Sequence, residues 1–142
     1  MEIRPIFNEL ATREAYAVYA DCMYEPTWEK YMEKVRIYKQ TPTVSAWSCY
    51  DANRMIGLLV IEIPRGQIAR IEGIAVDIKY RRQGVGRKLI EHAMQILKIT
   101  ILEVETDSGA VDFYRKCGFT AQQLIKQSKQ GKYERFYCVL RK

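Results

Sequence analysis

The stretch IAVDIKYRRQGVGR, residues 74–87, indicates how this chain folds. An apolar strand runs into a short basic loop, and glycines at 84 and 86 then open a helix whose apolar residues recur at helical spacing. The glycines let the backbone approach a ligand closely. The first turn of such a helix leaves about four amide N–H groups without partners and carries partial positive charge. The stretch therefore predicts a loop that binds a pyrophosphate.

Other phosphate-binding loops fit this stretch less well. The pattern GxGxxG is absent because Leu89 stands at its last position, and GxxxxGK followed by Ser or Thr is absent from the chain. Paired glycines are a weak signal by themselves. On the loop alone, a tight strand-to-helix turn with a solvated basic face remains the alternative.

The rest of the chain alternates strands and helices around this loop. We expect strands at residues 2–7, 43–50, 55–63, 68–76, 99–105, 120–125 and 133–140. We expect helices at residues 8–22, 28–39, 85–96 and 107–117, and turns at residues 51–54, 64–67 and 130–131. The order β-α-α-β-β-β-α-β-α-β-β, without repeat or linker, predicts one mixed α/β domain over residues 1–142.

Capping residues set the expected helix ends. Asn8 is expected to cap the first helix, and Asp107 or Ser108 the last. Gly118 follows the last helix at the position that is commonly left-handed, so Phe119 should fold back on Tyr114 as in a Schellman ending.

The composition is that of an ordinary globular chain. Its 142 residues are 48% hydrophobic and 28% charged, which fits one domain with a substantial core. No run approaches the roughly 20 apolar residues needed to cross a bilayer. Residues 1–5 lack the apolar core of a secretory signal. We expect a cytoplasmic protein without a membrane partner.

Cysteine and histidine give no sign of a metal site. The four cysteines stand far apart without a CxxC pair, and the single histidine, His92, has no neighbour at ligand spacing. We therefore expect no metal, and four reduced, mostly buried thiols rather than disulfides.

The net charge of +6 is concentrated in two stretches. Residues 79–88 contain basic side chains and no acid, and residues 126–142 have Glu134 as their one acid. Either stretch could hold a phosphorylated ligand or nucleic acid, or form a solvated face. A nucleic-acid-binding domain is a rival hypothesis, but the chain lacks a zinc finger, an RNA-recognition motif and a clear helix-turn-helix. We expect no nucleic-acid partner.

Two motifs resemble those of the GNAT superfamily of acetyl-CoA-dependent N-acetyltransferases. Residues 81–86, RRQGVG, are similar to the family's acetyl-CoA signature, R/Q-x-x-G-x-G/A. Residues 110–119, AVDFYRKCGF, are similar to its second motif at the expected distance downstream. The resemblance extends to the element order and implies a mixed, mostly antiparallel sheet of about seven strands flanked by four helices. It also implies acetyl transfer from acetyl-CoA to a primary amine by direct attack on the thioester in a ternary complex.

The resemblance further implies which residues hold acetyl-CoA. In the family, the strand matching residues 72–76 separates from the next strand at a bulge, and pantetheine pairs with its backbone. Amides of the loop hold the pyrophosphate. The expected cofactor residues are Ile74, Ala75, Val76, Arg81, Arg82, Gln83, Gly84, Val85, Gly86, Arg87, Asp107 and Tyr114. The family usually has asparagine where Asp107 stands, and an ionised carboxylate cannot donate a hydrogen bond, so helix capping is the alternative role for Asp107.

The same resemblance gives the candidate catalytic residues. Tyr114 matches the family's frequent general acid, which protonates the departing thiolate, although it could also orient the thiol or pack in the core. Glu72 is the first candidate for the base because it precedes the bulge, where apolar walls would raise its pKa. Glu103 and Glu105, two apart on one face of the neighbouring strand, are alternatives. Each of these acids could instead be an exposed strand residue.

The acceptor side is less defined. In the family, the first two helices and the last strands form the amine-binding wall, and the corresponding region here contains Tyr16, Tyr19, Asp21, Tyr24, Glu25, Trp28, Glu29 and Tyr31. Rings beside carboxylates suit a cationic amine, whereas aromatic residues at helical spacing are more often core. The acceptor could be a small-molecule or a protein amine, and a homodimer is one expected assembly. The alternative function is a GNAT fold that binds acyl-CoA without catalysis.

Overall fold

The computed structural model describes residues 1–64 and 68–142. Its strands and helices are β1 (Glu2–Ile6), α1 (Arg13–Tyr19), α2 (Trp28–Gln40), β2 (Val44–Asp51), β3 (Arg54–Glu62), β4 (Ile68–Val76), α3 (Val85–Ile96), β5 (Ile101–Thr106), α4 (Val111–Lys116), β6 (Thr120–Ser128) and β7 (Gly131–Arg141). The predicted mixed α/β order is confirmed. The turn expected at residues 64–67 falls on the gap and lies outside the described residues.

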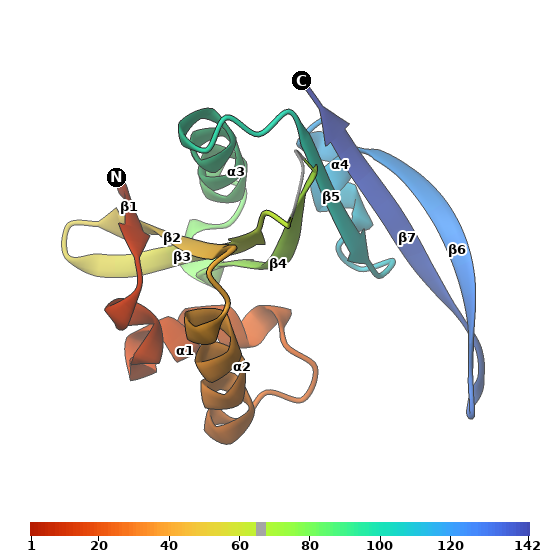
Figure 1. The fold of residues 1–142 in the computed structure, drawn as a ribbon, viewed down its shortest axis with the longest axis horizontal. Helices are drawn as coiled ribbons and strands as arrows, with labels where there is room; N and C mark the ends of the chain where they lie inside the picture. Colours follow the sequence, from red (N-terminus) through yellow and green to blue (C-terminus); the bar gives the residue numbers. More distant parts are fainter. Residues whose placement is uncertain (65–67) are drawn as a thin grey trace.

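The strands form one sheet in the order β1-β2-β3-β4-β5-β7-β6 (Figure 1). β4 and β5 are parallel, and every other neighbouring pair is antiparallel. Because α3 connects β4 to β5, it supplies the crossover that a parallel pair requires. The predicted mostly antiparallel sheet of seven strands is therefore confirmed.

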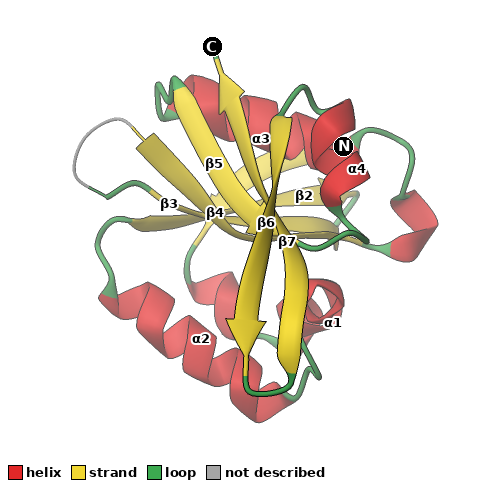
Figure 2. Ribbon diagram, turned by 90° about the vertical axis from the view of Figure 1, so that its right-hand side faces the viewer, coloured by secondary structure: helices red, strands yellow, loops and turns green. Residues whose placement is uncertain are grey.

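Two helices cover each face of the sheet (Figure 2). Helices α1 and α2 lie on one face and pack a core that includes Tyr19 and Tyr31. Helices α3 and α4 lie on the other and pack a second core that includes Leu89. β3 lies between the two cores, and the side chains of Leu58 and Leu59 on its opposite faces are fully buried. Burial on both faces explains the continuous apolar character of this strand.

The predicted helix over residues 8–22 is divided in the structure. A 3₁₀ helix, η1 (Asn8–Ala11), precedes α1, and a second, η2 (Ala20–Cys22), follows it. Thr12 is extended, and its hydroxyl accepts a hydrogen bond from the Ala15 amide at 3.2 Å, so it caps α1. The prediction that Asn8 caps this helix is wrong, because Thr12 provides the cap four residues later.

The predicted ending of α4 is confirmed, whereas its start differs. Gly118 is left-handed with φ of +96°, and the Phe119 amide donates to the Tyr114 carbonyl at 3.0 Å. The rings of Phe119 and Tyr114 meet edge to face at 5.3 Å. The helix begins at Val111, because Asp107 holds a separate turn before it.

The structure also bears on the expectations for cysteines, metal sites and membrane spans. Cys49 and Cys138 are buried and Cys117 is half-buried, but Cys22 is exposed, and all four are free thiols. Within residues 1–64 and 68–142, no group of three or more His, Cys, Asp or Glu side chains could hold a metal ion. Over the same residues, every helix is too short or too polar to span a bilayer.

Candidate functional site

The site begins where β4 and β5 separate. The two strands pair only from Ile68 with Ile101 to Arg70 with Glu103, and β5 then continues along β7. On its other edge, β4 carries a bulge, because Val60 and Ile61 of β3 oppose Gly73 and Ile71. Glu72 is the extra residue of this bulge. Beyond it, the backbone of β4 that faces β5 has no strand partner among residues 1–64 and 68–142.

A close contact explains why glycine follows Glu72. A Cβ atom at Gly73 would lie 2.1 Å from the hydroxyl oxygen of Tyr19, so no side chain fits there. The Tyr19 hydroxyl also lies 3.1 Å from that of Tyr38 on α2. The helical layer therefore reaches the bulge through a pair of tyrosines. The sequence offered one signal for this contact, a glycine in the interior of a strand.

The predicted phosphate loop has the geometry of an anion cradle. Gly84 is left-handed with φ of +78°, and a Cβ atom added to it would meet open space. Gly86 is buried, and a Cβ atom there would lie 2.8 Å from Cζ of Phe113. Among the described residues, the amides of residues 82–87 have no hydrogen-bond acceptor. These N–H groups, with the positive end of α3, are free to bind an anion.

The three arginines of the loop differ in their surroundings. Arg81 donates to the carboxylate of Asp21 at 2.5 Å and to the Val76 carbonyl at 3.1 Å. Arg87 pairs with Glu91 at 3.0 Å, one turn along α3. Arg82 has a positive φ of 64°, and the structure gives its side chain no ion pair within the described ranges. Arg81 thus ties the loop to η2.

Tyr114 lies at the other side of the opening. Its ring is buried, with 5% of its surface exposed, and packs edge to face on Phe113 and Phe119. Its hydroxyl makes no hydrogen bond, yet no buried polar side-chain atom of the described residues lacks a partner, so this hydroxyl touches solvent. Burial, with the nearby Cys22 thiol, raises the pKa of Tyr114 above its ordinary value. The phenol therefore stays protonated at neutral pH.

Glu72 is the candidate acid whose pKa is raised. The causes are partial burial of its carboxyl group and the nearby carboxylate of Glu62. The residue as a whole remains exposed, at the bulge beside the Tyr19 and Tyr38 pair. Glu72 therefore combines access to solvent with a pKa shifted toward neutrality.

Glu103 and Glu105 are engaged by other side chains. Glu103 accepts a hydrogen bond from Arg70 at 3.2 Å and one from the Tyr137 hydroxyl at 2.6 Å. Glu105 pairs with Lys126 at 2.5 Å and with Arg135 at 3.3 Å. The hydrogen bond from Lys126 lowers the pKa of Glu105. Both carboxylates are thus occupied by partners on other strands.

Asp107 closes a local turn before α4. Its Oδ1 accepts hydrogen bonds from the Gly109 amide at 2.9 Å and from the Ala110 amide at 3.0 Å. One carboxylate oxygen is therefore used within the turn that precedes α4, whereas the N-cap residue of α4 is Ala110 and forms no side-chain cap.

The predicted aromatic wall is mostly core. Tyr16, Tyr19, Trp28 and Tyr31 stack on one another, with ring centroids 5.4–6.1 Å apart. Tyr31 is buried and donates to the Leu10 carbonyl at 2.6 Å. Tyr24 is 85% exposed. Most of these rings, which recur at helical spacing, therefore pack in the core under α1 and α2 rather than around a ligand.

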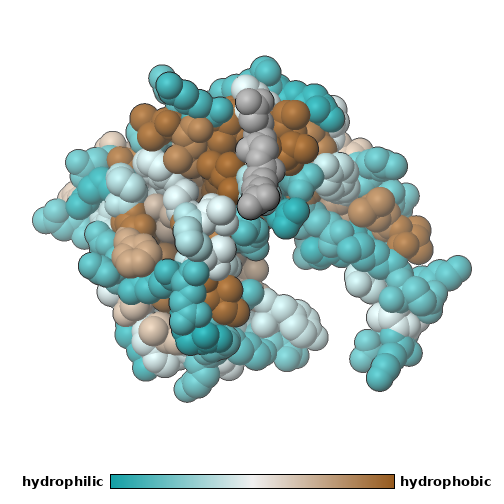
Figure 3. Space-filling model, viewed as in Figure 1, coloured by the Kyte–Doolittle hydropathy of each residue, from teal (hydrophilic) through white to brown (hydrophobic). Residues whose placement is uncertain are grey.

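The sequence did not single out Cys22, which lies beside the opening. The residue is exposed, but its thiol turns inward and donates to the Tyr19 carbonyl at 3.2 Å. Burial of the thiol raises its pKa to about 11, and the Ile74 backbone lies close by. In the space-filling view a wide notch separates the lobe of α1 and α2 from the β6–β7 arm (Figure 3). The opening between β4 and β5 lies at the head of this notch.

Comparisons with known proteins agree with this geometry. The sequence model of the Acetyltransferase (GNAT) family matches residues 7–119. The chain is 32% identical over 73 residues to an uncharacterized N-acetyltransferase of Methanocaldococcus jannaschii. That match takes in 47% of this chain and 32% of the relative, so it spans about a third of the relative's length.

Solved structures share the fold along nearly the whole chain. The ribosomal-protein-S18-alanine N-acetyltransferase of Escherichia coli superposes with a TM-score of 0.75 at 21% identity, covering 99% of this chain and 92% of that one. A GNAT family acetyltransferase of Elizabethkingia anophelis, solved with acetyl-CoA bound, gives 0.73 at 18% identity, covering 99% and 97%. The resemblance carried by the two sequence motifs is confirmed.

Proposed function

Since the chain belongs to the acetyltransferase (GNAT) family, we propose that it transfers the acetyl group of acetyl-CoA to a primary amine by direct attack of the amine on the thioester. One observation carries this proposal. A carboxylate with a raised pKa, Glu72, and a protonated phenol, Tyr114, flank the opening between β4 and β5. An amine acetylation needs a base for the incoming nitrogen and a proton for the departing sulfur.

The chain's own groups fit acetyl-CoA. The free amides of residues 82–87 and the positive end of α3 match a pyrophosphate. The unpaired edge of β4 at Ile74, Ala75 and Val76 offers backbone groups to an extended amide chain, as a partner strand would. When bound, acetyl-CoA supplies an acetyl group that is activated as a thioester.

Glu72 is proposed as the base. A primary amine is mostly protonated at neutral pH and must lose a proton before it can attack. A carboxylate with an ordinary pKa is a weak base for this step, and the raised pKa of Glu72 improves the match. Glu103 is held by Arg70 and Tyr137, which disfavours it.

Tyr114 is proposed as the acid. A phenol is protonated at neutral pH, burial raises the pKa of this one further, and its hydroxyl touches solvent without a competing hydrogen bond. It can therefore hold a proton at its oxygen until the thiolate departs. Phe113 and Phe119 fix the ring from both sides, which orients that oxygen.

The remaining expectations belong to the same proposal. We propose that residues 1–142 act as one N-acetyltransferase domain in the cytoplasm, with a small-molecule or protein amine as acceptor. The Escherichia coli protein described above acts on an alanine of a ribosomal protein, which makes a protein amine one candidate. A homodimer is the assembly we propose to test by light scattering.

Thiol release tests the proposal. The full chain is incubated with acetyl-CoA and a panel of primary amines, while free thiol is followed and products are identified by mass spectrometry. We expect thiol release that requires both the protein and an amine, with an acetylated amine as product. Acetyl-CoA binding by calorimetry without thiol release from any amine contradicts catalysis and supports the non-catalytic alternative. Tight DNA binding with a steep salt dependence and no acetyl-CoA binding supports the nucleic-acid rival.

A further inference from the structure

A surface hollow lies beside the proposed reaction site, on the side of α2. It has a volume of about 580 Å³ and is lined by Met23, Tyr24, Glu29, Lys30, Glu33 and Lys34. Met23 directly follows Cys22, whose thiol lies close to the Ile74 backbone at the unpaired edge of β4. The hollow therefore adjoins the opening between β4 and β5.

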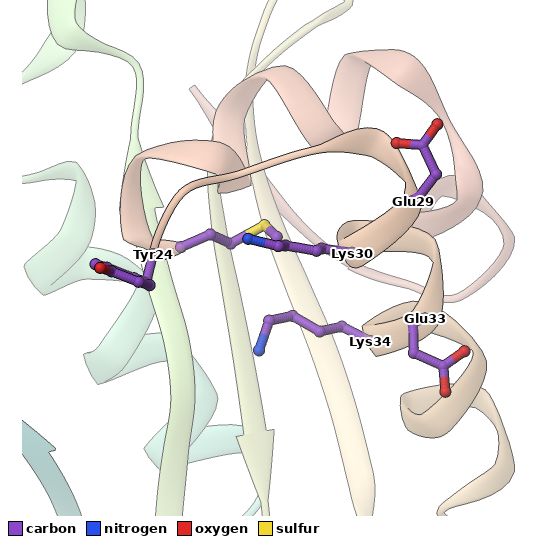
Figure 4. A pocket seen from close by; sticks show the side chains of 6 residues that line it. Tyr24, Glu29, Lys30, Glu33 and Lys34 are labelled. Carbon is purple, nitrogen blue, oxygen red and sulfur yellow. The ribbon is translucent and has the colours of Figure 1, made fainter. Parts of the chain in front are cut away.

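The charged side chains around the hollow point in different directions (Figure 4). Lys30 and Lys34 extend from α2 toward Tyr24, whereas Glu29 and Glu33 point to the opposite side of the helix. The Glu33 carboxylate pairs with Arg36, one turn along α2. The charge that faces the hollow is therefore positive, although its lining contains equal numbers of acids and bases.

These two ammonium groups lack a carboxylate partner in the described parts of the chain. Lys30 donates to the Glu25 carbonyl at 2.8 Å, which uses one of its three N–H groups. Neither Lys30 nor Lys34 forms an ion pair within residues 1–64 and 68–142. Like charges four residues apart on a helix repel each other. An anion between them would relieve this repulsion.

Lys34 also connects the hollow to the proposed base. Its charge acts on both Glu72 and Cys22, so its ammonium group lies on the side of α2 that faces the bulge. A molecule that presents its amine to Glu72 is thus exposed to the charge of Lys34. Because Lys30 and Lys34 are both cationic, a second group on that molecule is favoured when it is negative.

We propose that Lys30 and Lys34 bind a carboxylate of the acceptor, so that the substrate class is amines that also carry a carboxylate close to the nitrogen, as amino acids do. The proposal rests on the acetyl transfer proposed above and adds the chemical class of its acceptor. The same two charges repel acceptors that are cationic throughout, such as polyamines, by placing ammonium groups opposite ammonium groups.

Matched amine pairs test this inference. Lysine and cadaverine, like phenylalanine and phenethylamine, differ by one carboxylate and share a primary amine. With saturating acetyl-CoA, we expect a higher kcat/KM for the carboxylate-bearing member of each pair. The Lys34→Gln variant should lose about tenfold in kcat/KM for that member, the size expected for one hydrogen bond to a charged group, and none for the other, whose ammonium group Lys34 repels. Lys30→Gln should act in the same direction.

Lys39→Gln is the control on the same helix. The Lys39 ammonium lies 5.1 Å from the ring centre of Phe7, away from the hollow, so this variant removes an equal charge from α2 without touching the site. It should keep the wild-type preference. An equal loss in Lys39→Gln and Lys34→Gln would reveal a general charge effect and overturn the proposal.

Binding measurements separate this inference from the proposed function. Each amine is titrated by calorimetry into the protein with saturating coenzyme A, a readout that does not depend on turnover. Tighter binding of lysine than of cadaverine, lost in Lys34→Gln, supports the carboxylate site even if no acetylation occurs. Acetylation of cadaverine in preference to lysine, or no binding of either carboxylate-bearing probe, overturns the inference. Acetyl transfer itself is decided separately, by the thiol-release experiment.

Discussion

Replacing Gly84 with alanine should weaken acetyl-CoA binding without unfolding the protein. Gly84 is left-handed with φ of +78°, and a methyl group added there would meet no atom within 4 Å. The perturbation is therefore in the backbone, where alanine in this conformation costs about 1–2 kcal/mol. If the free loop relaxes to avoid this strain, it must return to the strained conformation when acetyl-CoA binds. The affinity for acetyl-CoA should then be about 5- to 30-fold weaker.

Gly86→Ala should act on stability instead. The new Cβ atom would lie 2.8 Å from Cζ of Phe113, a buried contact that forces α3 and α4 apart. Overpacking of this kind costs about 1–3 kcal/mol, which for a domain of this size lowers Tm by about 3–10 °C. Because Phe113 packs on Tyr114, turnover should fall as well.

Calorimetric titration with acetyl-CoA and thermal unfolding of each variant measure these effects. Gly131→Ala is the matched control, since Gly131 has φ of +115° and open space at the tip of the β6–β7 hairpin. It likewise places alanine at a positive φ, far from the loop, and should leave the affinity for acetyl-CoA unchanged. Equal losses of affinity in Gly84→Ala and Gly131→Ala, or no loss in either, would refute the assignment of the pyrophosphate to the amides of this loop.

Three further variants test individual side chains. Tyr114→Phe should lower kcat at least tens-fold while the affinity for acetyl-CoA, measured by calorimetry, is kept; near-normal turnover would leave solvent as the proton source. In Glu62→Gln, loss of the neighbouring carboxylate lowers the pKa of Glu72, so the base stays ionised to lower pH and the acid limb of the kcat–pH profile should move down; an unmoved limb would exclude Glu62 as a cause. Asp21→Asn removes the exposed ion pair that ties Arg81 of the loop to η2, worth about 0.2–1 kcal/mol, so the affinity for acetyl-CoA should fall by at most about fivefold. A much larger loss in calorimetry would show that this ion pair does more than a surface contact.

Features encoded by neighbouring residues were predictable from the sequence. The strand, basic loop and glycine pair of residues 74–87 lie within one short segment, and the structure keeps their expected geometry. The Schellman ending at Gly118 is equally local, because it needs only a glycine and a following apolar residue. The division of the first helix was missed because two capping candidates, Asn8 and Thr12, stand four residues apart and the sequence does not rank them.

Contacts between residues far apart in the chain could not be predicted from the sequence. Arg81 and Asp21 are 60 positions apart, and nothing local marks them as partners. The hydroxyl of Tyr19 fills the space over Gly73 only because α1 packs across β4 at that point. Each contact depends on how layers stack, which periodicity does not specify.

The sequence also could not distinguish the three candidate acids from one another. Glu72, Glu103 and Glu105 each directly follow an apolar residue on a predicted strand, so their sequence surroundings look alike. Their differences come from neighbouring strands, since Tyr137 on β7 and Lys126 on β6 engage Glu103 and Glu105. Strand order, rather than local pattern, leaves Glu72 as the acid with a raised pKa.

The central claim, that Glu72 removes the proton from the amine, is tested most directly by comparing Glu72→Gln with Glu103→Gln. Thiol release is measured at saturating acetyl-CoA with the best acceptor from the amine panel, from about pH 6 to about pH 9, which spans the range over which a tuned general base titrates. The account predicts that Glu72→Gln loses at least tens-fold in kcat and its acid limb, keeps its affinity for acetyl-CoA, and that Glu103→Gln stays near the wild-type rate. A large loss in Glu103→Gln with normal turnover in Glu72→Gln would contradict it and place the base on β5.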